Sequence, residues 1–151
     1  MVDLIIILSL TALGYFVGSW VEKRHYSSIR EREQQFLRLP AITTKEIPFP
    51  AGRIRSIKLV EGSAVISIDY FKRLLAMLRN IFGGTITSYE SLLDRARRES
   101  LLRMKEQAPE AAIIVNVRIE TSAIGKYSRK RNIGCLEALA YGTAVTLVEQ
   151  E

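Results

Sequence analysis

The chain is poor in the residues that most often build catalytic and metal centres. Among its 151 residues there is one cysteine, Cys135, and one histidine, His25. A single cysteine excludes an internal disulfide, and these two residues are too few for a four-ligand zinc site. A Ser-His-Asp or Cys-His catalytic arrangement would have to be built around His25. We therefore expect no enzyme activity, no catalytic residues, no cofactor and no metal site.

Other site chemistries find little support in the residue pattern. Asp69, Glu120 and Glu137 are isolated acids, so a hard-metal site through them stays open but is not favoured. Cys135 follows a basic loop that could favour a reactive thiolate, although a small hydrophobic residue entering a strand is the preferred interpretation. The Gly83-Gly84 pair lacks the Lys-Ser/Thr that follows a phosphate-binding loop.

Charge is absent from residues 4–21, which are mostly apolar. This run approaches the ~20 residues that cross a bilayer. A cleaved signal peptide is disfavoured, because the one early charge is Asp3 and Ser19-Trp20-Val21 is a poor cleavage site. Basic residues follow the run, which predicts an outside N-terminus and a cytoplasmic main domain. We expect an inner-membrane protein with an anchor at 1–22 and a juxtamembrane helix or linker at 23–40.

The predicted anchor and its flank offer two candidate contacts. Gly14 and Gly18 form a small-xxx-small pair that would let two helices approach closely, although such pairs also arise by chance. The basic residues after the anchor could contact anionic lipid, but a topology signal is the favoured interpretation. Residues 30–33 alternate Arg and Glu and are interpreted as a solvated helix face.

A single cytoplasmic α+β domain is expected over residues 41–151. The pattern predicts strands at 41–47, 54–66, 111–121 and 136–148, the second with a bend or bulge at Gly62 and the last interrupted by Gly142. Helices are expected at 71–82, ended by Gly83-Gly84, and from Thr87 to before Pro109. Pro40 marks the start of the domain.

The second of these helices has the clearest local signals. Thr87 and Glu90 match a capping box, in which each side chain accepts a hydrogen bond from the other residue's backbone. Asp94 and Arg98, and Glu99 and Arg103, are spaced as i, i+4 ion pairs. In the strand that follows, Val115, Val117 and Ile119 are expected on one face.

A set of residues along the domain resembles the YbjQ-like family, small proteins labelled as heavy-metal-binding. The matching residues are Arg79, Asn80, Gly83, Gly84, Tyr89, Arg97, Arg103, Met104, Gly142 and Thr143. The chain departs from the family pattern at residues 110–112, where Glu-Ala-Ala stands for Gly-Ala-Asn. The resemblance implies a dodecin-like or YbjQ-like α+β subunit with a mainly antiparallel sheet, which assembles as a homopentamer and has no established activity.

The net charge of +6 is concentrated partly in a loop between two predicted strands. Its basic residues are Lys126, Arg129, Lys130 and Arg131. Tyr127 is the one aromatic residue among them, so nucleic-acid binding is not favoured. A solvated basic loop is the preferred interpretation.

Together these patterns predict a non-enzymatic, membrane-anchored homo-oligomer that scaffolds partners or holds an unknown ligand. Membrane lipid, further copies of the chain and other membrane or cytoplasmic proteins are the expected partners. A subunit of a channel or transporter accessory complex, and a metal- or small-ligand-binding module, are the alternatives.

Overall fold

The computed structural model describes residues 2–67, 87–124 and 135–148. Its elements in chain order are α1 (Val2–Gln35), the short 3-10 turn η1 (Ala51–Arg53), β1 (Ile54–Ser67), α3 (Thr87–Glu106), β2 (Ile113–Ile124) and β3 (Cys135–Leu147). The strands form one antiparallel sheet in the order β1-β3-β2. The expected small α+β fold with an antiparallel sheet is confirmed. The helix expected at 71–82 lies outside the described residues.

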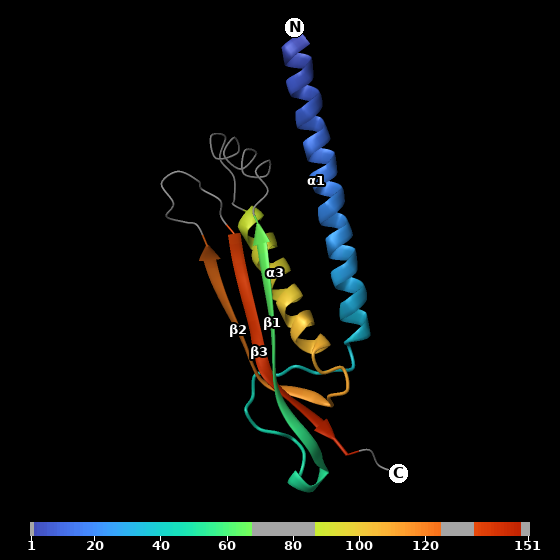
Figure 1. Cartoon of the computed structure of the whole chain (residues 1–151), viewed down its shortest axis with the longest axis vertical. Coiled ribbons are helices and arrows are strands. Elements are labelled where there is room, and N and C mark those ends of the chain that lie inside the picture. Colours follow the sequence, from blue (N-terminus) through green and yellow to red (C-terminus); the bar gives the residue numbers. More distant parts are fainter. Residues whose placement is uncertain (1, 68–86, 125–134, 149–151) are drawn as a thin grey trace.

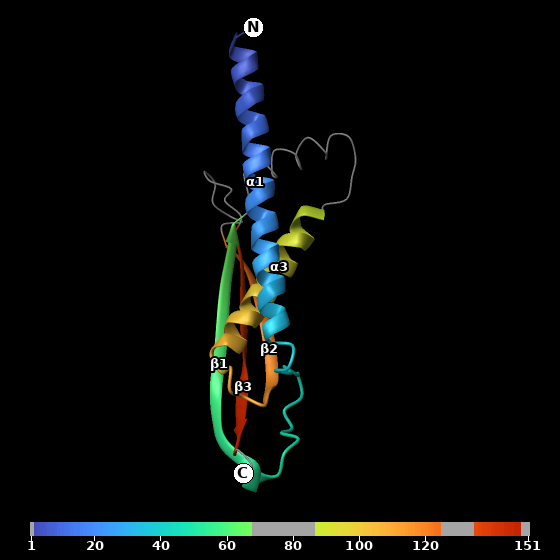
Figure 2. The ribbon, with the colours of Figure 1, turned by 90° about the vertical axis from the view of Figure 1, so that its right-hand side faces the viewer.

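Among the residues that the structure describes, helices lie on one face of the sheet. Figures 1 and 2 show α3 lying across the sheet and α1 running along the outer side of α3. The C-terminal half of α1 packs beside α3, whereas its N-terminal half projects beyond the end of the sheet. The opposite face of the sheet therefore has no helix over it among the described residues.

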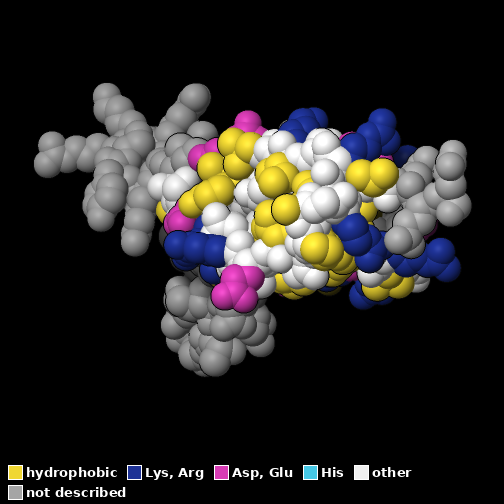
Figure 3. Space-filling model, turned by 90° about the horizontal axis from the view of Figure 1, so that it is seen from below, with side chains coloured by type: hydrophobic (Ala, Val, Ile, Leu, Met, Phe, Trp, Pro, Cys, Tyr) yellow, Lys and Arg dark blue, Asp and Glu magenta, His cyan; other side chains and the backbone are white. Residues whose placement is uncertain are grey.

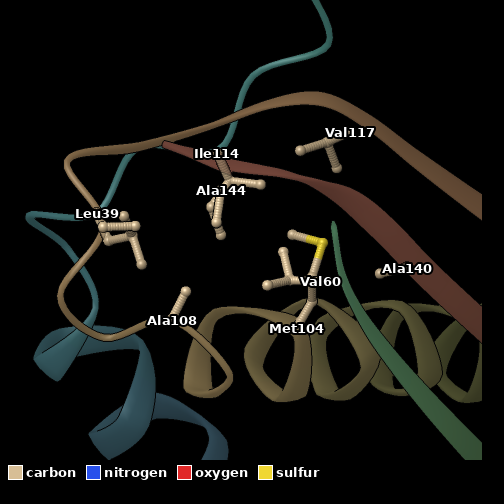
Figure 4. Packing of buried hydrophobic residues seen from close by; sticks show 9 residues of the cluster. Leu39, Val60, Met104, Ala108, Ile114, Val117, Ala140 and Ala144 are labelled. Carbon is tan, nitrogen blue, oxygen red and sulfur yellow. The ribbon is translucent and has the colours of Figure 1, made fainter. Parts of the chain in front are cut away.

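The main core fills the layer between α3 and the sheet. Met104 of α3 is fully buried and lies among residues from β1, β2 and β3 (Figure 4). Burying a side chain of this size contributes roughly 1.5–3 kcal/mol. The buried members of this cluster are Leu39, Val60, Met104, Ala108, Ala111, Ile114, Val117, Ala140 and Ala144. Several are alanines, which let the helix approach the strands closely.

Gly62 marks a close approach of α3 to β1. The strand runs without a break from Ile54 to Ser67, and its register shift lies between Ile54 and Ser56. The bend or bulge expected at Gly62 is therefore absent. A Cβ at Gly62 would lie 2.3 Å from the backbone oxygen of Ser100 and 2.4 Å from the backbone nitrogen of Met104. Glycine is needed here because the helix backbone occupies the space of a side chain.

Asn116 forms a bulge in β2 that reverses part of the expected face pattern. Its φ of 54° is left-handed, a conformation that asparagine tolerates better than most residues. The pairing with β3 shifts between Val115 and Arg118. Val115 packs with Ile113 on one side of the sheet, whereas Val117 joins the core cluster on the α3 side. The prediction that Val115 and Val117 share a face is wrong, because the extra residue turns the strand over.

Gly142 lies in β3 opposite this bulge. β3 continues through it from Cys135 to Leu147, so the predicted interruption is not seen. A Cβ at this position would lie 2.9 Å from Cγ2 of Ile114 and 3.1 Å from Cγ2 of Val117. The glycine thus makes room for the side chains that the bulge brings together.

Residues 41–47 are not a strand. A single parallel bridge joins Ala41 to Ile114, and Asn116 donates a backbone hydrogen bond of 2.7 Å to Thr44. The segment then crosses the helix-free face of the sheet near the start of β1. There it contributes to an apolar cluster of Ile42, Ile47, Phe49, Ile54, Ile113, Val115, Val145 and Leu147. Ile42 and Ile47 thus pack against side chains of the strands, whereas Thr43 and Thr44 are exposed.

The predicted membrane anchor needs correction. Among the described residues, no helix combines the length and apolar character required to cross a bilayer. α1 is 34 residues long, and a charged half follows its apolar part without a break. The inner-membrane location and outside N-terminus predicted from this segment are therefore wrong.

Candidate interaction surfaces

Ion pairs join the charged half of α1 to α3. Arg32 of α1 pairs with Glu99 and, at 3.1 Å, with Glu106 of α3. Glu33 of α1 accepts two hydrogen bonds from Arg98, at 2.7 and 2.5 Å. Residues 30–33 are therefore not simply a solvated face, because Arg32 and Glu33 fix α1 on α3. Nothing in the local sequence around Arg32 and Glu33 indicates that their partners lie on a distant helix.

We call the interface formed by these ion pairs the seam between α1 and α3. Glu99 is its most buried carboxylate. Burial by itself would raise the pKa of Glu99, but hydrogen bonds from Arg32 and Arg103 outweigh it and hold the pKa below its usual value. The Arg103 bond, at 2.9 Å, and the Asp94–Arg98 pair, at 3.5 Å, are the two i, i+4 pairs that the sequence predicts. The ionised form of Glu99 is thus the form that holds the two helices together.

His25 lies at the same helix interface among positive charges. Burial lowers its pKa, and the nearby Arg95 lowers it further, with smaller effects from Arg32 and Arg103. Glu99 is the opposing negative charge. Nδ1 of His25 is buried and makes no hydrogen bond to any residue that the structure describes. The neutral imidazole is favoured here.

The described residues of the family pattern divide between packing and the seam. Met104 is in the core and Gly142 faces the β2 bulge. Arg103 pairs with Glu99 and donates a 2.8 Å hydrogen bond to the backbone oxygen of Ser63. Arg97 is exposed on α3 and Thr143 is half-buried. These residues do not converge on one site.

The remaining predicted residues are spread along the chain. Tyr89 lies within α3. Arg79, Asn80, Gly83 and Gly84 and the basic-loop residues Lys126, Arg129, Lys130 and Arg131 all lie outside the described residues. Cys135 is half-buried at the first residue of β3, and Gly14 and Gly18 lie in the projecting half of α1.

A shallow hollow of about 250 Å³ lies where α3 crosses the free edge of β1. Arg103 of α3 and Gln107, just after α3, line it with Glu61 and Ser63 of β1. Glu61 donates its backbone N–H to the Gln107 side chain at 3.2 Å, and Arg103 bonds the Ser63 oxygen. The side chains of Arg103 and Gln107 thus satisfy backbone groups of an edge strand that would otherwise be unpaired. The hollow is therefore used for edge protection, which disfavours it as a ligand site.

The helix-free sheet face carries exposed apolar side chains beyond the reach of the 41–54 segment. The pairing places Leu59, Ser63 and Val65 of β1 on this face, opposite Thr143, Leu139 and Glu137 of β3. Leu59 is 68% exposed and Val65 is 56% exposed. We name this surface the open sheet face: Leu59, Glu61, Ser63, Val65, Arg118, Glu120, Ser122, Glu137, Leu139, Tyr141 and Thr143.

Apolar and basic groups also occur together at the end of the molecule seen from below. In Figure 3 hydrophobic side chains gather near the middle of this view, with Lys and Arg on both sides of them. This mixed surface differs from a strongly basic patch of the kind that binds a phosphate backbone. It adds no support for nucleic-acid binding.

The metal label of the resembling family can be tested against the donor atoms. Within residues 2–67, 87–124 and 135–148, no three His, Cys, Asp or Glu residues lie close enough to hold an ion. Glu137 accepts a 3.2 Å hydrogen bond from Ser122. The described residues therefore do not fit a metal centre, since stable sites need several convergent ligands.

Comparison with known proteins decides the family. The family described as "Putative heavy-metal-binding" (YbjQ) matches residues 41–148. The chain belongs to the YbjQ family. A UPF0145 protein of Hahella chejuensis is 40% identical over 96 residues, which are 62% of this chain and 86% of that protein. One from Thermococcus kodakarensis is 35% identical over 113 residues, covering 73% and 92%. The resemblance to the YbjQ family is thus confirmed for the domain.

A solved structure from this comparison is more distant. It is a protein of unknown function of the DUF74 family from Pediococcus pentosaceus, with 14% identity and a TM-score of 0.41. The match covers 73% of this chain and 98% of that structure.

Proposed function

We propose that this YbjQ-family protein is a non-enzymatic, homo-oligomeric structural protein whose copies meet through the open sheet face. The observation that carries the proposal is the exposure of Leu59 and Val65 on the face of the sheet opposite to the one that α3 packs against. A three-stranded sheet with apolar side chains on both faces is stabilised by a cover on each. Exposed apolar patches on folded domains commonly mark interaction sites.

A second copy of the chain is the occupant that the surface fits best. The open sheet face carries both signs of charge, with Arg118 and Glu61 on opposite sides of Tyr141 across the three strands. A surface with both signs can complement another copy of itself. Tyr141 is half-buried and provides an aromatic anchor at the centre, as interfaces often do. The homopentamer implied by the family resemblance is the assembly we favour.

The native mass of the full chain, measured by light scattering after gel filtration, tests this function. We expect a mass several times the 17.1 kDa of one chain. Leu59→Lys should lower that mass at equal protein concentration, because it places a charge in the interface. Leu37→Lys is the matched control: Leu37 is 76% exposed, follows the end of α1 and is not part of the open sheet face.

An unchanged mass for Leu59→Lys would refute the sheet-face interface. A monomeric wild-type protein across the accessible concentration range would refute the homo-oligomer itself. Far-UV circular dichroism on the same samples checks that the variants are folded.

A further inference from the structure

The projecting half of α1 is a second apolar surface, separate from the open sheet face. Its exposed large apolar side chains are Ile5, Ile6, Leu10, Leu13, Tyr15, Phe16, Val17, Trp20 and Val21. Each is about half exposed or more. With roughly 150–250 Å² available on each aromatic and somewhat less on each aliphatic residue, they offer on the order of 1,000 Å². That area matches the ~800 Å² per partner of a standard protein interface.

The arrangement of these side chains limits what can cover them. Successive residues turn by about 100° around a helix, so Tyr15 and Val17 point to nearly opposite sides. They are 50% and 52% exposed. A single flat partner surface would cover one side and leave the other in water. A helix that is apolar all round is normally buried on all sides.

The polar groups of this segment are also compatible with burial. The hydroxyl of Ser9 donates to the backbone oxygen of Ile6 at 2.8 Å, so burying it leaves no unsatisfied donor. No atom lies within 4 Å of a Cβ built on Gly14, which leaves room for a second helix to approach at this position. Residues 4–21 contain no charge whose desolvation would oppose packing.

The rest of α1 holds this segment in a defined position. The pairs of Arg32 with Glu99 and of Glu33 with Arg98 fix the C-terminal half on α3. The part from Ile5 to Val21 then extends roughly 25 Å as a rod beyond the sheet (Figures 1 and 2). Such a rod can meet rods of other copies without disturbing the domain.

We infer that the N-terminal halves of α1 from three or more copies of this chain pack together as a helix bundle. A bundle places neighbours on more than one side of each helix, which a pair of helices does not. This interface does not require the open sheet face, and it makes α1 a self-assembly element added to the YbjQ domain.

The single tryptophan of the chain, Trp20, reports on this bundle directly. In lipid-free buffer we expect its emission to shift to the blue and its quenching by acrylamide to fall at least twofold as protein concentration rises. Phe16→Glu should abolish both changes and lower the native mass. Leu37→Glu, at a comparably exposed apolar residue outside the bundle, should leave both unchanged.

The outcomes separate this inference from the proposed function. Loss of the Trp20 change in Phe16→Glu with a remaining Leu59-dependent oligomer supports the bundle beside the sheet interface. An oligomer in which Trp20 stays fully quenchable overturns the bundle and leaves the sheet interface standing. Protection of Trp20 in a monomer would overturn the bundle in favour of cover by the same chain. Protection that requires added phosphatidylcholine vesicles would overturn it in favour of cover by lipid.

Discussion

Replacing Gly62 by alanine tests how closely α3 packs on the sheet. The added Cβ would lie 2.3 Å from the Ser100 oxygen, 2.4 Å from the Met104 nitrogen and 2.8 Å from Cβ of Arg103. Two of these atoms are backbone, so a side-chain rotation cannot relieve the overlap. The helix must move away from β1, which loosens the packing of Met104 in the core.

The expected cost follows from that geometry. Overpacking a close-packed core costs typically 1–3 kcal/mol, and we expect about 3 kcal/mol because helix backbone is displaced. This corresponds to roughly a 100-fold smaller folding constant. Urea unfolding followed by circular dichroism at 222 nm, at fixed protein concentration, measures the difference.

A matched glycine provides the control. Gly52 lies in η1, where no atom is within 4 Å of an added Cβ. Gly52→Ala should therefore change the free energy of unfolding by less than about 1 kcal/mol. Equal urea midpoints for the Gly62 and Gly52 variants would refute the close approach of α3 to β1.

Two further predictions concern the seam between α1 and α3. Glu99→Gln should reduce the free energy of unfolding by about 2 kcal/mol, because it leaves Arg32 without its buried partner. Glu106→Gln, at the more exposed partner of Arg32, should cost less than about 1 kcal/mol. Equal losses in the two variants would contradict the larger contribution of Glu99. For His25, the folded-state pKa is lowered, so the unfolded chain binds its proton first and stability falls as pH drops below about 6.5. His25→Gln should flatten the stability profile between pH 7 and 5, and an unchanged slope would remove His25 as its source.

Local signals in the sequence predicted much of the α3 region and the sheet. α3 covers Thr87 to Glu106 and ends before Pro109 as expected, and the two i, i+4 ion pairs form. The final strand runs from Cys135 to Leu147, within one residue of its predicted bounds at each end. These features depend on neighbours within a few residues, which a sequence shows directly.

Features that depend on contacts remote in the sequence were missed. The close approach at Gly62 requires α3, some 40 residues later, and the β2 bulge requires the left-handed conformation at Asn116. The pairing of Arg32 and Glu33 with α3 joins residues more than 60 positions apart. Gly62 did carry a usable signal, because a glycine inside a strand marks either a bulge or a close backbone approach.

The apolar N-terminal run shows a different limit. Composition alone favoured a membrane anchor, whereas the described helices include no membrane span. The same residues remain exposed on a helix that is fixed to the domain by the seam. An apolar run indicates that its side chains are buried by some partner, but the sequence alone does not identify that partner.

The native mass of the wild-type chain beside that of Leu59→Lys tests the central claim most directly. Light scattering after gel filtration should give a mass several times 17.1 kDa for the wild-type protein and a clearly smaller mass for the variant. Leu37→Lys should match the wild-type protein. The same mass for all three proteins, whether monomeric or oligomeric, would contradict assembly through the open sheet face.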